Sequence, residues 1–307
     1  MAQHLIHIGY PKAGSTFLQA WFEGHPELGY TPGGLGGFHN VYEICRGTGT
    51  ILKYYVTSYE GLCTPNESAG AVPLEMSLRW NEHTSRIKKD QADVCTLLKS
   101  LYPESRIIIV TRGFKAMIVS GYSQYVRAGG VLGASKAVPD KVMNDAYRYV
   151  YQYYDFNYLI QLYSEAFGEH NLIILPYELL RDDQDRFLRV LEQRLDLKHA
   201  DIKLGRLNPS LSPEELYWYP AISRVVAAAA SRLGPKPFEK IYGWYVSKTL
   251  DNKLRPFIKV LQRLNPDRKI TEANFSDEIL THCSGKASRL RDHSLYAPYA
   301  KEYLWDE

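Results

Sequence analysis

Residues 5–19, LIHIGYPKAGSTFLQ, combine the residue types that hold a phosphate group. The short apolar run 5–8 predicts a buried strand, and a loop containing Gly9 and Gly14 leads to a helix that opens at Ser15. Backbone N–H groups and the helix dipole converge on an anion at such a strand–loop–helix junction. The stretch therefore predicts a phosphate-binding loop.

The spacing of this loop nearly matches G-x-x-x-x-G-K-[ST], the nucleotide-binding P-loop. Gly9 and Gly14 fit the pattern, and Thr16 supplies the hydroxyl, but Ser15 stands in the place of the lysine. The loop lysine is instead Lys12, three residues earlier. In a P-loop the lysine bridges the β- and γ-phosphates, and Mg²⁺ binds the following hydroxyl. The displaced lysine favours a donor with less charge and no obligatory metal.

A second candidate phosphate contact follows the strongest strand signal in the chain. Residues 106–111, RIIIVT, predict a central parallel strand that is covered on both faces, and Arg112 ends it. Ser120 lies eight residues later in a predicted helix, 114–125, two turns along and facing back toward the strand end. A guanidinium fork suits a phosphate dianion, although a plain surface arginine is the alternative interpretation of Arg112.

These two motifs, in this order, resemble the PAPS-dependent sulfotransferases. The stretch 10–17, YPKAGSTF, is similar to their 5′-phosphosulfate-binding loop, and Arg112 with Ser120 is similar to their 3′-phosphate signature. The resemblance covers residues 1–210 and is to the bacterial, carbohydrate-type members. It implies 3′-phosphoadenosine 5′-phosphosulfate (PAPS) as donor, 3′,5′-ADP as product and no metal. The donor contacts that it implies in the loop are Pro11, Lys12, Ala13, Gly14, Ser15, Thr16 and Phe17.

The resemblance assigns further roles outside the loop. Lys12 is expected to neutralise charge on the bridging oxygen as the S–O bond breaks, which makes it a catalytic candidate. Residues 175–180, LPYELL, look like the strand-to-helix segment of the family, and Arg206 is the expected third phosphate contact.

The general base has several candidates. It must reach an acceptor hydroxyl at the carboxyl ends of the strands. Glu75, in the predicted strand 71–76, resembles the Ser-x-Glu segment of the carbohydrate-type enzymes but lacks the preceding serines. His25, His39 and His83 are the alternatives.

Strands that alternate with helices through residues 1–200 predict an α/β fold, a P-loop-like three-layer sandwich around a central parallel sheet. Residues 29–50, with seven glycines, predict a long loop. The predicted strands are 5–8, 71–76, 106–111 and 171–175, and the predicted helices are 15–23, 90–101, 114–125, 140–167 and 188–195.

The strand signal disappears after Gly205, and 221–233 is helical. We expect one sulfotransferase domain over 1–307, with a PAPS-binding core, 1–210, and a helical C-terminal addition, 211–307. Residues 236–268 carry eight Lys/Arg against three Asp/Glu, interleaved with aromatic residues. Such a segment is either a solvated helical face or a contact for a membrane surface or an acidic glycan.

Composition sets the remaining expectations. The 307 residues carry a net charge of +3, which is too small to argue for a nucleic-acid partner. The first predicted strand leaves no room for a signal peptide, and no window approaches 18 apolar residues. We therefore expect a cytoplasmic protein, with no prediction of its oligomeric state. Four cysteines without metal-ligand spacing are expected as reduced thiols: Cys45, Cys63, Cys95 and Cys283.

The expected function is sulfuryl transfer from PAPS to a hydroxyl of a carbohydrate or glycolipid. A small-molecule or secondary-metabolite hydroxyl is the alternative acceptor. A P-loop nucleotide kinase and a non-catalytic binding module are the alternatives from other classes.

Overall fold

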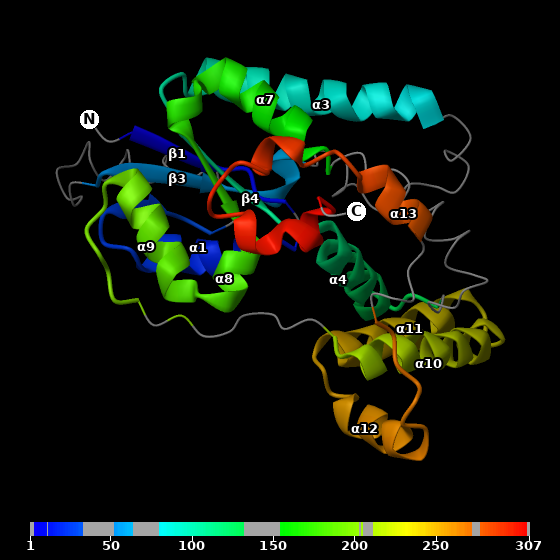
Figure 1. The fold of residues 1–307 in the computed structure, drawn as a ribbon. Helices are drawn as coiled ribbons and strands as arrows, with labels where there is room; N and C mark the ends of the chain where they lie inside the picture. Colours follow the sequence, from blue (N-terminus) through cyan, green and yellow to red (C-terminus); the bar gives the residue numbers. More distant parts are fainter. Residues whose placement is uncertain are drawn as a thin grey trace. The chain divides into compact units, whose positions relative to one another are not determined.

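The computed structural model describes residues 3–10, 12–32, 52–63, 80–131, 154–202, 204, 211–271 and 277–305. The chain forms two compact units. The core unit comprises Met1–Phe114, Tyr149–Asn208 and Cys283–Glu307, and the helical unit comprises Lys115–Arg148 and Pro209–His282. Figure 1 shows the elements of each unit.

A parallel sheet of five strands organises the core unit, in the order β2-β3-β1-β4-β5. Every described pairing in it is parallel, which confirms the predicted central parallel sheet. Chain order reverses between β1 and β4, and ligands of such sheets bind at the carboxyl ends of the two strands that flank this switch point. The strands are β1 (Gln3–His7), β2 (Leu28–Tyr30), β3 (Tyr54–Ser58), β4 (Arg106–Thr111) and β5 (Leu172–Pro176).

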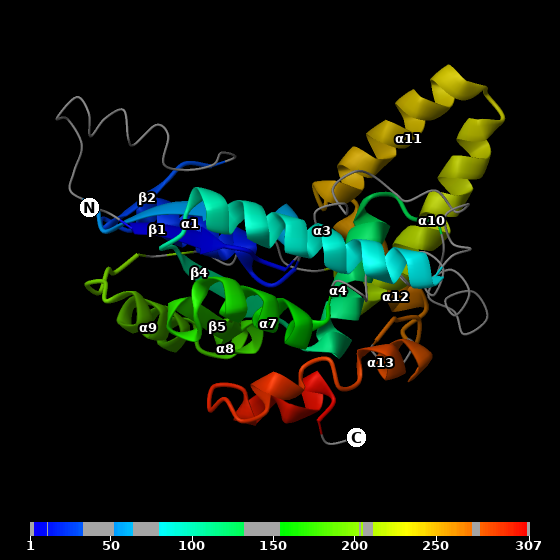
Figure 2. The same ribbon diagram turned by 90° about the horizontal axis from the view of Figure 1, so that it is seen from above.

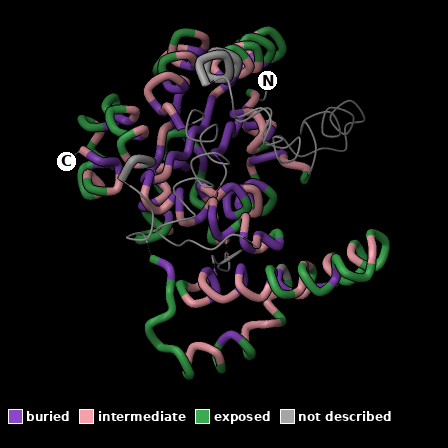
Figure 3. Tube along the Cα trace, turned by 90° about the vertical axis from the view of Figure 1, so that its right-hand side faces the viewer, coloured by how far each residue is buried: buried purple, intermediate pink, exposed green. Residues whose placement is uncertain are grey.

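Helices cover both faces of this sheet, so the core unit has the predicted three layers (Figure 1). α3 (Trp80–Leu101) and α7 (Phe156–Phe167) pack together on one face. The other face carries α1 (Ser15–Gly24), α8 (Tyr177–Asp182) and α9 (Gln184–Leu195). The strands between these layers are continuously apolar where they are covered twice: Ile107, Ile108, Ile109 and Val110 of β4 are fully buried. Figure 3 shows the buried segments gathered in the interior of this unit.

The structure corrects three expectations. Residues 28–30 form β2 at the start of the predicted loop 29–50, and 54–58 form β3, which the apolar pattern does not predict. The predicted helix 140–167 does not continue through Asp155, whose carboxylate accepts the Tyr158 N–H and caps α7 at Phe156. The predicted strand 71–76 lies outside the described residues.

The apolar pattern of the sequence does not predict β3, because two of its buried side chains are polar. Thr57 and Ser58 are buried, and each bonds to a histidine of β1. Thr57 Oγ1 lies 2.8 Å from His4 Nε2, and Ser58 Oγ lies 2.8 Å from His7 Nδ1. Because these groups satisfy each other, burial of the strand costs little despite its polarity.

The helical unit is built from α4 (Phe114–Arg127, in this unit from Lys115 on), α10 (Pro213–Ser231), α11 (Pro235–Leu250) and α12 (Arg255–Leu264). α10 begins well before the predicted 221–233, because Ser212 and Glu215 form a reciprocal capping box. α10 and α11 form a helical hairpin (Figure 2), and Ser223 Oγ bonds to Tyr245 Oη between them at 2.8 Å. No helix in the described ranges has the length and apolar character needed to cross a bilayer.

The chain returns to the core unit at its C-terminal segment. α13 (Asp277–Cys283) leads to two short 3₁₀ segments, Ser288–Leu290 and Ala297–Tyr303. Tyr296 and Tyr303 are fully buried there against Thr111, the last residue of β4. This segment therefore lies at the carboxyl end of a central strand.

Candidate functional site

The loop after β1 has the backbone geometry of an anion cradle. The Ala13 N–H donates to the Tyr10 carbonyl at 3.2 Å and closes a turn. Lys12 has φ 66° and Gly14 has φ 86°, both left-handed, and Gly14 is the N-cap of α1 without a side-chain cap. A first helical turn has N–H groups with no intrahelical partner. These groups and the helix dipole make the start of α1 favourable for a negative charge.

Both glycines of the loop are required by close contacts. A methyl group at Gly9 would lie 2.6 Å from His7 Cε1 and 2.7 Å from Ser15 Oγ. One at Gly14 would lie 2.7 Å from Leu180 Cδ2, besides straining the left-handed backbone. A side chain at either position would therefore displace His7, Ser15 or Leu180 from its place beside the loop.

The polar side chains of the loop fit a bound anion. Ser15 Oγ is buried, and no partner for it exists among the described residues. Thr16 is exposed and Lys12 is half-buried. Ala13 and Phe17 have buried side chains, so they can offer a ligand only their backbone groups. An orphaned buried hydroxyl beside uncapped N–H groups is what an absent anionic ligand would leave.

The buried imidazole of His7 lies against the loop after β1. His7 Nδ1 bonds to Ser58 Oγ, and Gln19 Nε2 donates to the same hydroxyl at 3.3 Å. Burial lowers the pKa of His7 to about 3, so the ring is neutral at physiological pH. Its Nε2 is buried without a described partner and, like Ser15 Oγ, would lie 2.7 Å from a methyl at Gly9. His7 thus packs against Gly9 and helps to hold the loop in position.

Arg112 links the turn after β4 to the loop after β1. Its Nη1 donates to the Lys12 carbonyl at 2.6 Å, across the switch point of the sheet. The guanidinium also stacks on Tyr177, with its Cζ 4.5 Å from the ring centroid. Burial lowers the pKa of Arg112, while Tyr177 and Glu178 oppose that shift. An arginine stays protonated at physiological pH even so.

The guanidinium retains donors for a ligand. Arg112 Nε is buried and bonds to no described residue. A buried charged donor without an acceptor is costly. The group is therefore suited to a phosphate, whose oxygens accept several N–H bonds at once.

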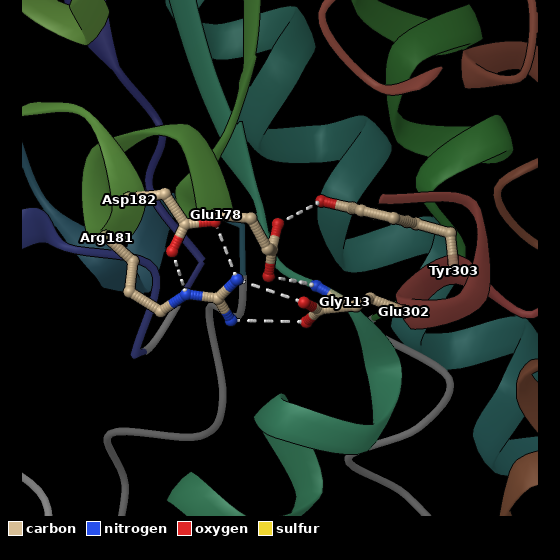
Figure 4. A network of polar contacts seen from close by, with 6 residues as sticks. All are labelled: Gly113, Glu178, Arg181, Asp182, Glu302 and Tyr303. Atoms are coloured by element: carbon tan, nitrogen blue, oxygen red, sulfur yellow. Dashed lines mark hydrogen bonds and ion pairs between the residues drawn. The ribbon is translucent and has the colours of Figure 1, made fainter. Parts of the chain in front are cut away.

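Glu178 fixes the backbone beside Arg112, as Figure 4 shows. Its Oε1 accepts the Gly113 N–H at 2.9 Å, and its Oε2 accepts the Tyr303 hydroxyl at 3.0 Å. Burial raises the pKa of Glu178, and the bond from Gly113 counteracts this. The carboxylate of the LPYELL segment thus joins the start of α8, the turn after β4 and the C-terminal segment.

The hydroxyl bonds around Thr111 have one consistent direction. Tyr303 has a single proton and donates it to Glu178, so it must accept from Thr111 Oγ1 at 2.9 Å. Thr111 Oγ1 then accepts from Tyr296 Oη at 2.8 Å. Arg181 adds an ion pair from α8 to Glu302 of the C-terminal segment at 3.1 Å. These bonds hold the carboxyl end of β4 in place.

The other predicted site residues are only partly placed. Pro11, Glu75, Arg206 and His39 lie outside the described residues. Ser120 is on α4 within the helical unit and is buried, and its pairing with Arg112 stays a prediction. His83 is on α3.

His25 is a structural residue, because both ring nitrogens are already used. Its Nε2 lies 3.2 Å from the Lys198 carbonyl, and its Nδ1 accepts the Glu27 N–H at 3.2 Å. Burial lowers its pKa, and only 2% of the residue is exposed. This leaves Glu75, His39 and His83 as candidates for the base.

The described part of the chain contains no group of three or more His, Cys, Asp or Glu residues that could hold a metal ion. Cys63, Cys95 and Cys283 are buried, and none of them forms a disulfide within the described residues.

A family model described as the sulfotransferase domain matches residues 2–204. The chain belongs to the sulfotransferase domain family. The matched region contains both candidate anion-binding turns, β1–α1 and the turn at Arg112, and the match confirms the predicted sulfotransferase. Among solved structures, a sulfotransferase from Alicyclobacillus acidocaldarius is similar at 14% identity and a TM-score of 0.45, over 79% of this chain and 97% of that one. No curated protein matches this chain significantly.

Sequence reasoning missed three supporting residues of this sulfotransferase. His7 stands in an apolar run, which predicts a strand and no role for the imidazole. Glu178 stands in the LPYELL segment, whose resemblance to the family assigns no role to its carboxylate. Tyr303 lies far from the motifs in sequence, and no local pattern connects it with Arg112. A buried-strand histidine and a buried acid after a strand are the signals that could have identified the first two.

Proposed function

We propose that this sulfotransferase moves a sulfuryl group from PAPS to a hydroxyl of a carbohydrate or glycolipid, releasing 3′,5′-ADP. The observation that carries the proposal is the bond from Arg112 to the Lys12 carbonyl, because it joins two anion-binding turns at one edge of the sheet. PAPS bears a 5′-phosphosulfate and a separate 3′-phosphate. Two adjoining anion sites suit a donor with two such groups.

The loop would hold the 5′-phosphosulfate. The backbone from Lys12 to Thr16 and the hydroxyls of Ser15 and Thr16 would supply donors. Pro11 stays a predicted donor contact. The orphaned Ser15 Oγ supports this role. Arg112 would hold the 3′-phosphate, with Ser120 and Arg206 as further contacts. The proposal requires no metal, since Lys12 and Arg112 supply the positive charge.

The reaction exchanges one S–O bond for another. The bond between sulfur and the bridging phosphate oxygen breaks, and its electron pair goes to that oxygen, which becomes a phosphate oxygen of 3′,5′-ADP. Sulfur forms its new bond to the acceptor oxygen, and the acceptor proton passes to the general base. Lys12 would stabilise the developing charge on the leaving oxygen. Glu75 is the proposed base, with His39 and His83 as alternatives.

The acceptor class rests on the resemblance of the loop and of the Glu75 segment to carbohydrate-type enzymes. A small-molecule or secondary-metabolite hydroxyl is the alternative. We propose that the reaction takes place in the cytoplasm, where PAPS and reduced thiols are expected, and that 1–307 acts as one sulfotransferase domain.

Thermal-shift titration tests the donor directly. We expect saturating 3′,5′-ADP without Mg²⁺ to raise the melting temperature by several degrees, because ligand binding to the folded state adds stability. The Arg112→Ala variant should lose most of this shift. Stabilisation only by Mg-ATP would contradict the proposal and favour a kinase. Binding of PAPS without sulfation of any hydroxyl acceptor in a broad carbohydrate and small-molecule panel would favour a non-catalytic module.

A further inference from the structure

α12 exposes a stripe of large apolar side chains on one face. Phe257, Val260 and Leu264 are spaced at i, i+3 and i+7, which places them on the same side of a helix. They are 52%, 51% and 73% exposed. A helix of a globular protein normally packs such a stripe against the core. Here no described residue covers it, and an exposed apolar patch of this kind marks an interaction surface.

The opposite side of α12 is already used to attach the helix to its own unit. Ile258 is 2% exposed, and Gln262 Oε1 accepts the Trp218 indole N–H of α10 at 3.4 Å. At the first residue of α12, Arg255 pairs with Glu215 of α10 at 2.7 Å. The exposed stripe is therefore a second face, held outward by contacts that the fold itself makes.

The charge on α12 itself has a single sign. Lys259 and Arg263 are exposed on the same helix, and α12 contains no Asp or Glu. At 100° per residue these two side chains flank the stripe on its polar side. An apolar face beside exposed cations is the pattern of helices that lie in the plane of a lipid–water interface.

α11 adds an exposed tryptophan, Trp244, to the same unit. Trp244 is 61% exposed and has Lys248 Nζ 5.7 Å from its ring centroid. Tryptophan favours the headgroup level of a bilayer, where its ring is half solvated. Seven of the ten large apolar residues that are exposed in the described chain belong to the segment 213–264: Val225, Leu233, Ile241, Trp244, Phe257, Val260 and Leu264. Figure 3 shows how much of this unit is exposed or half-buried.

We propose that α12, assisted by α11, docks on a bilayer surface that contains anionic lipid. The apolar stripe would enter the acyl–headgroup boundary, and Lys259 and Arg263 would meet anionic headgroups. A second copy of the same stripe is a poorer occupant, because it would bring these two cations against their own kind without an acid on α12 to pair them. The inference is independent of the proposed acceptor, although a lipid-borne acceptor would lie at the same surface.

Vesicle co-sedimentation of the full chain tests the docking. We expect binding to phosphatidylcholine vesicles that contain phosphatidylglycerol, weak binding to phosphatidylcholine alone, and loss of binding as salt screens the charges. Binding to both vesicle types with equal affinity at every salt concentration would overturn the charge argument. Absence of binding to either would overturn the proposal entirely, and neither result bears on whether 3′,5′-ADP stabilises the protein.

Matched variants separate the stripe from general stickiness. Phe257→Asp should weaken vesicle binding at least about tenfold, since it removes a large apolar side chain from the interface. Leu97→Asp on α3 is the control, because Leu97 is exposed to a similar degree, 57%, and belongs to the core unit. Circular dichroism verifies that both variants are folded. Equal losses in the two variants would contradict a role for α12.

Charge variants test the second half of the proposal. Lys259→Glu with Arg263→Glu should cost about fivefold or more per residue, as each cation near an anionic surface contributes roughly 1 kcal/mol. Lys89→Glu on α3 should bind as the parent does. Sedimentation velocity distinguishes the rival occupant: a dimer that Phe257→Asp converts to a monomer, together with no vesicle binding, would assign the stripe to a second copy and refute docking on lipid.

Discussion

Arg112 Nη1 donates to the carbonyl oxygen of Lys12 at 2.6 Å, so the two turns that bear the candidate phosphate ligands are held by one bond. The contact gives Arg112 two tasks. It orders the left-handed turn at Lys12, and it keeps its buried Nε available for a ligand. A change at Arg112 should therefore affect donor binding by loss of charge and by loosening of the loop.

Replacement of Arg112 should act mainly on the donor. We expect Arg112→Ala to raise the KM for PAPS by about ten- to a hundredfold, because hydrogen bonds to charged groups contribute roughly 1.5–3 kcal/mol. Arg106→Ala is the matched control, since Arg106 begins β4 and lies at the opposite end of the strand. Steady-state kinetics with varied PAPS measure both. An unchanged KM in Arg112→Ala would remove Arg112 from the donor site.

Lys12 should influence turnover more than binding. We expect Lys12→Ala to lower kcat by about 10²-fold or more, because a preorganised positive charge on the leaving oxygen is lost. The exposed Lys89 provides the control substitution, Lys89→Ala. Single-turnover rates at saturating PAPS make the comparison, and a kcat close to that of the parent would contradict the proposed role of Lys12.

Glu75 is tested by removal of its basicity alone. We expect Glu75→Gln to lower kcat by about 10²-fold or more if the carboxylate is the base. Glu104→Gln, at an exposed glutamate, should leave kcat unchanged. Full activity of the Glu75 variant would move the search to His39 and His83, whose alanine variants are then compared in the same assay.

Tyr303 should influence the donor site from a distance. Tyr303→Phe removes the proton that Glu178 Oε2 accepts and leaves a buried carboxylate oxygen without its partner. We expect a loss of about 1–3 kcal/mol in the free energy of unfolding and a severalfold rise in the KM for PAPS, with kcat little changed. Urea unfolding and kinetics test this, with Tyr299→Phe as control. A stability loss without any change in KM would show that Glu178 does not position the Arg112 turn.

The neutral imidazole of His7 makes stability depend on pH. Burial holds the pKa of His7 at about 3 in the folded protein, against 6.5 when the residue is unfolded. The folded state therefore resists protonation, and its stabilising contribution is complete above 6.5 and is lost as pH falls toward 3. Between pH 7.5 and pH 5 the loss should be about 2 kcal/mol.

Urea unfolding at the two pH values measures this loss. His7→Gln should remove the His7 part of the dependence on pH, whatever it does to absolute stability, and leave the part due to His4, whose pKa burial lowers to about 4. His170→Gln, at an exposed histidine, should keep the parental dependence. The same slope in the parent and in His7→Gln would contradict the assignment.

The parts of the fold that could be predicted are those determined by residues close together in sequence. The run 106–111 is β4 as predicted, because continuous β-branched residues suit a strand covered on both faces. The loop between Gly9 and Gly14 has the expected strand–loop–helix form, since its two glycines meet close contacts and one adopts a left-handed backbone. Such features depend on residues a few positions apart.

The features that escaped prediction depend on distant partners. β3 is stabilised by histidines of β1, about fifty residues away, so its polar residues suggested no buried strand. Glu178 gains its role from Gly113 and from Tyr303, which no periodicity connects with it. Burial of a polar group is decided by whichever partner the fold brings to it, and that partner is not visible in the local pattern.

The return of the chain to β4 has a consequence for synthesis. The hydroxyl of Thr111 bonds to those of Tyr296 and Tyr303, which follow it in the chain by 185 and 192 residues. The contacts of Arg112 with Lys12 and of Gly113 with Glu178 use residues made earlier, but the two tyrosine bonds to Thr111 cannot form until residue 303 has left the ribosome. Ordering by such remote contacts is slow. We therefore expect the sheet of the core to form during translation before the contacts at the carboxyl end of β4 are complete.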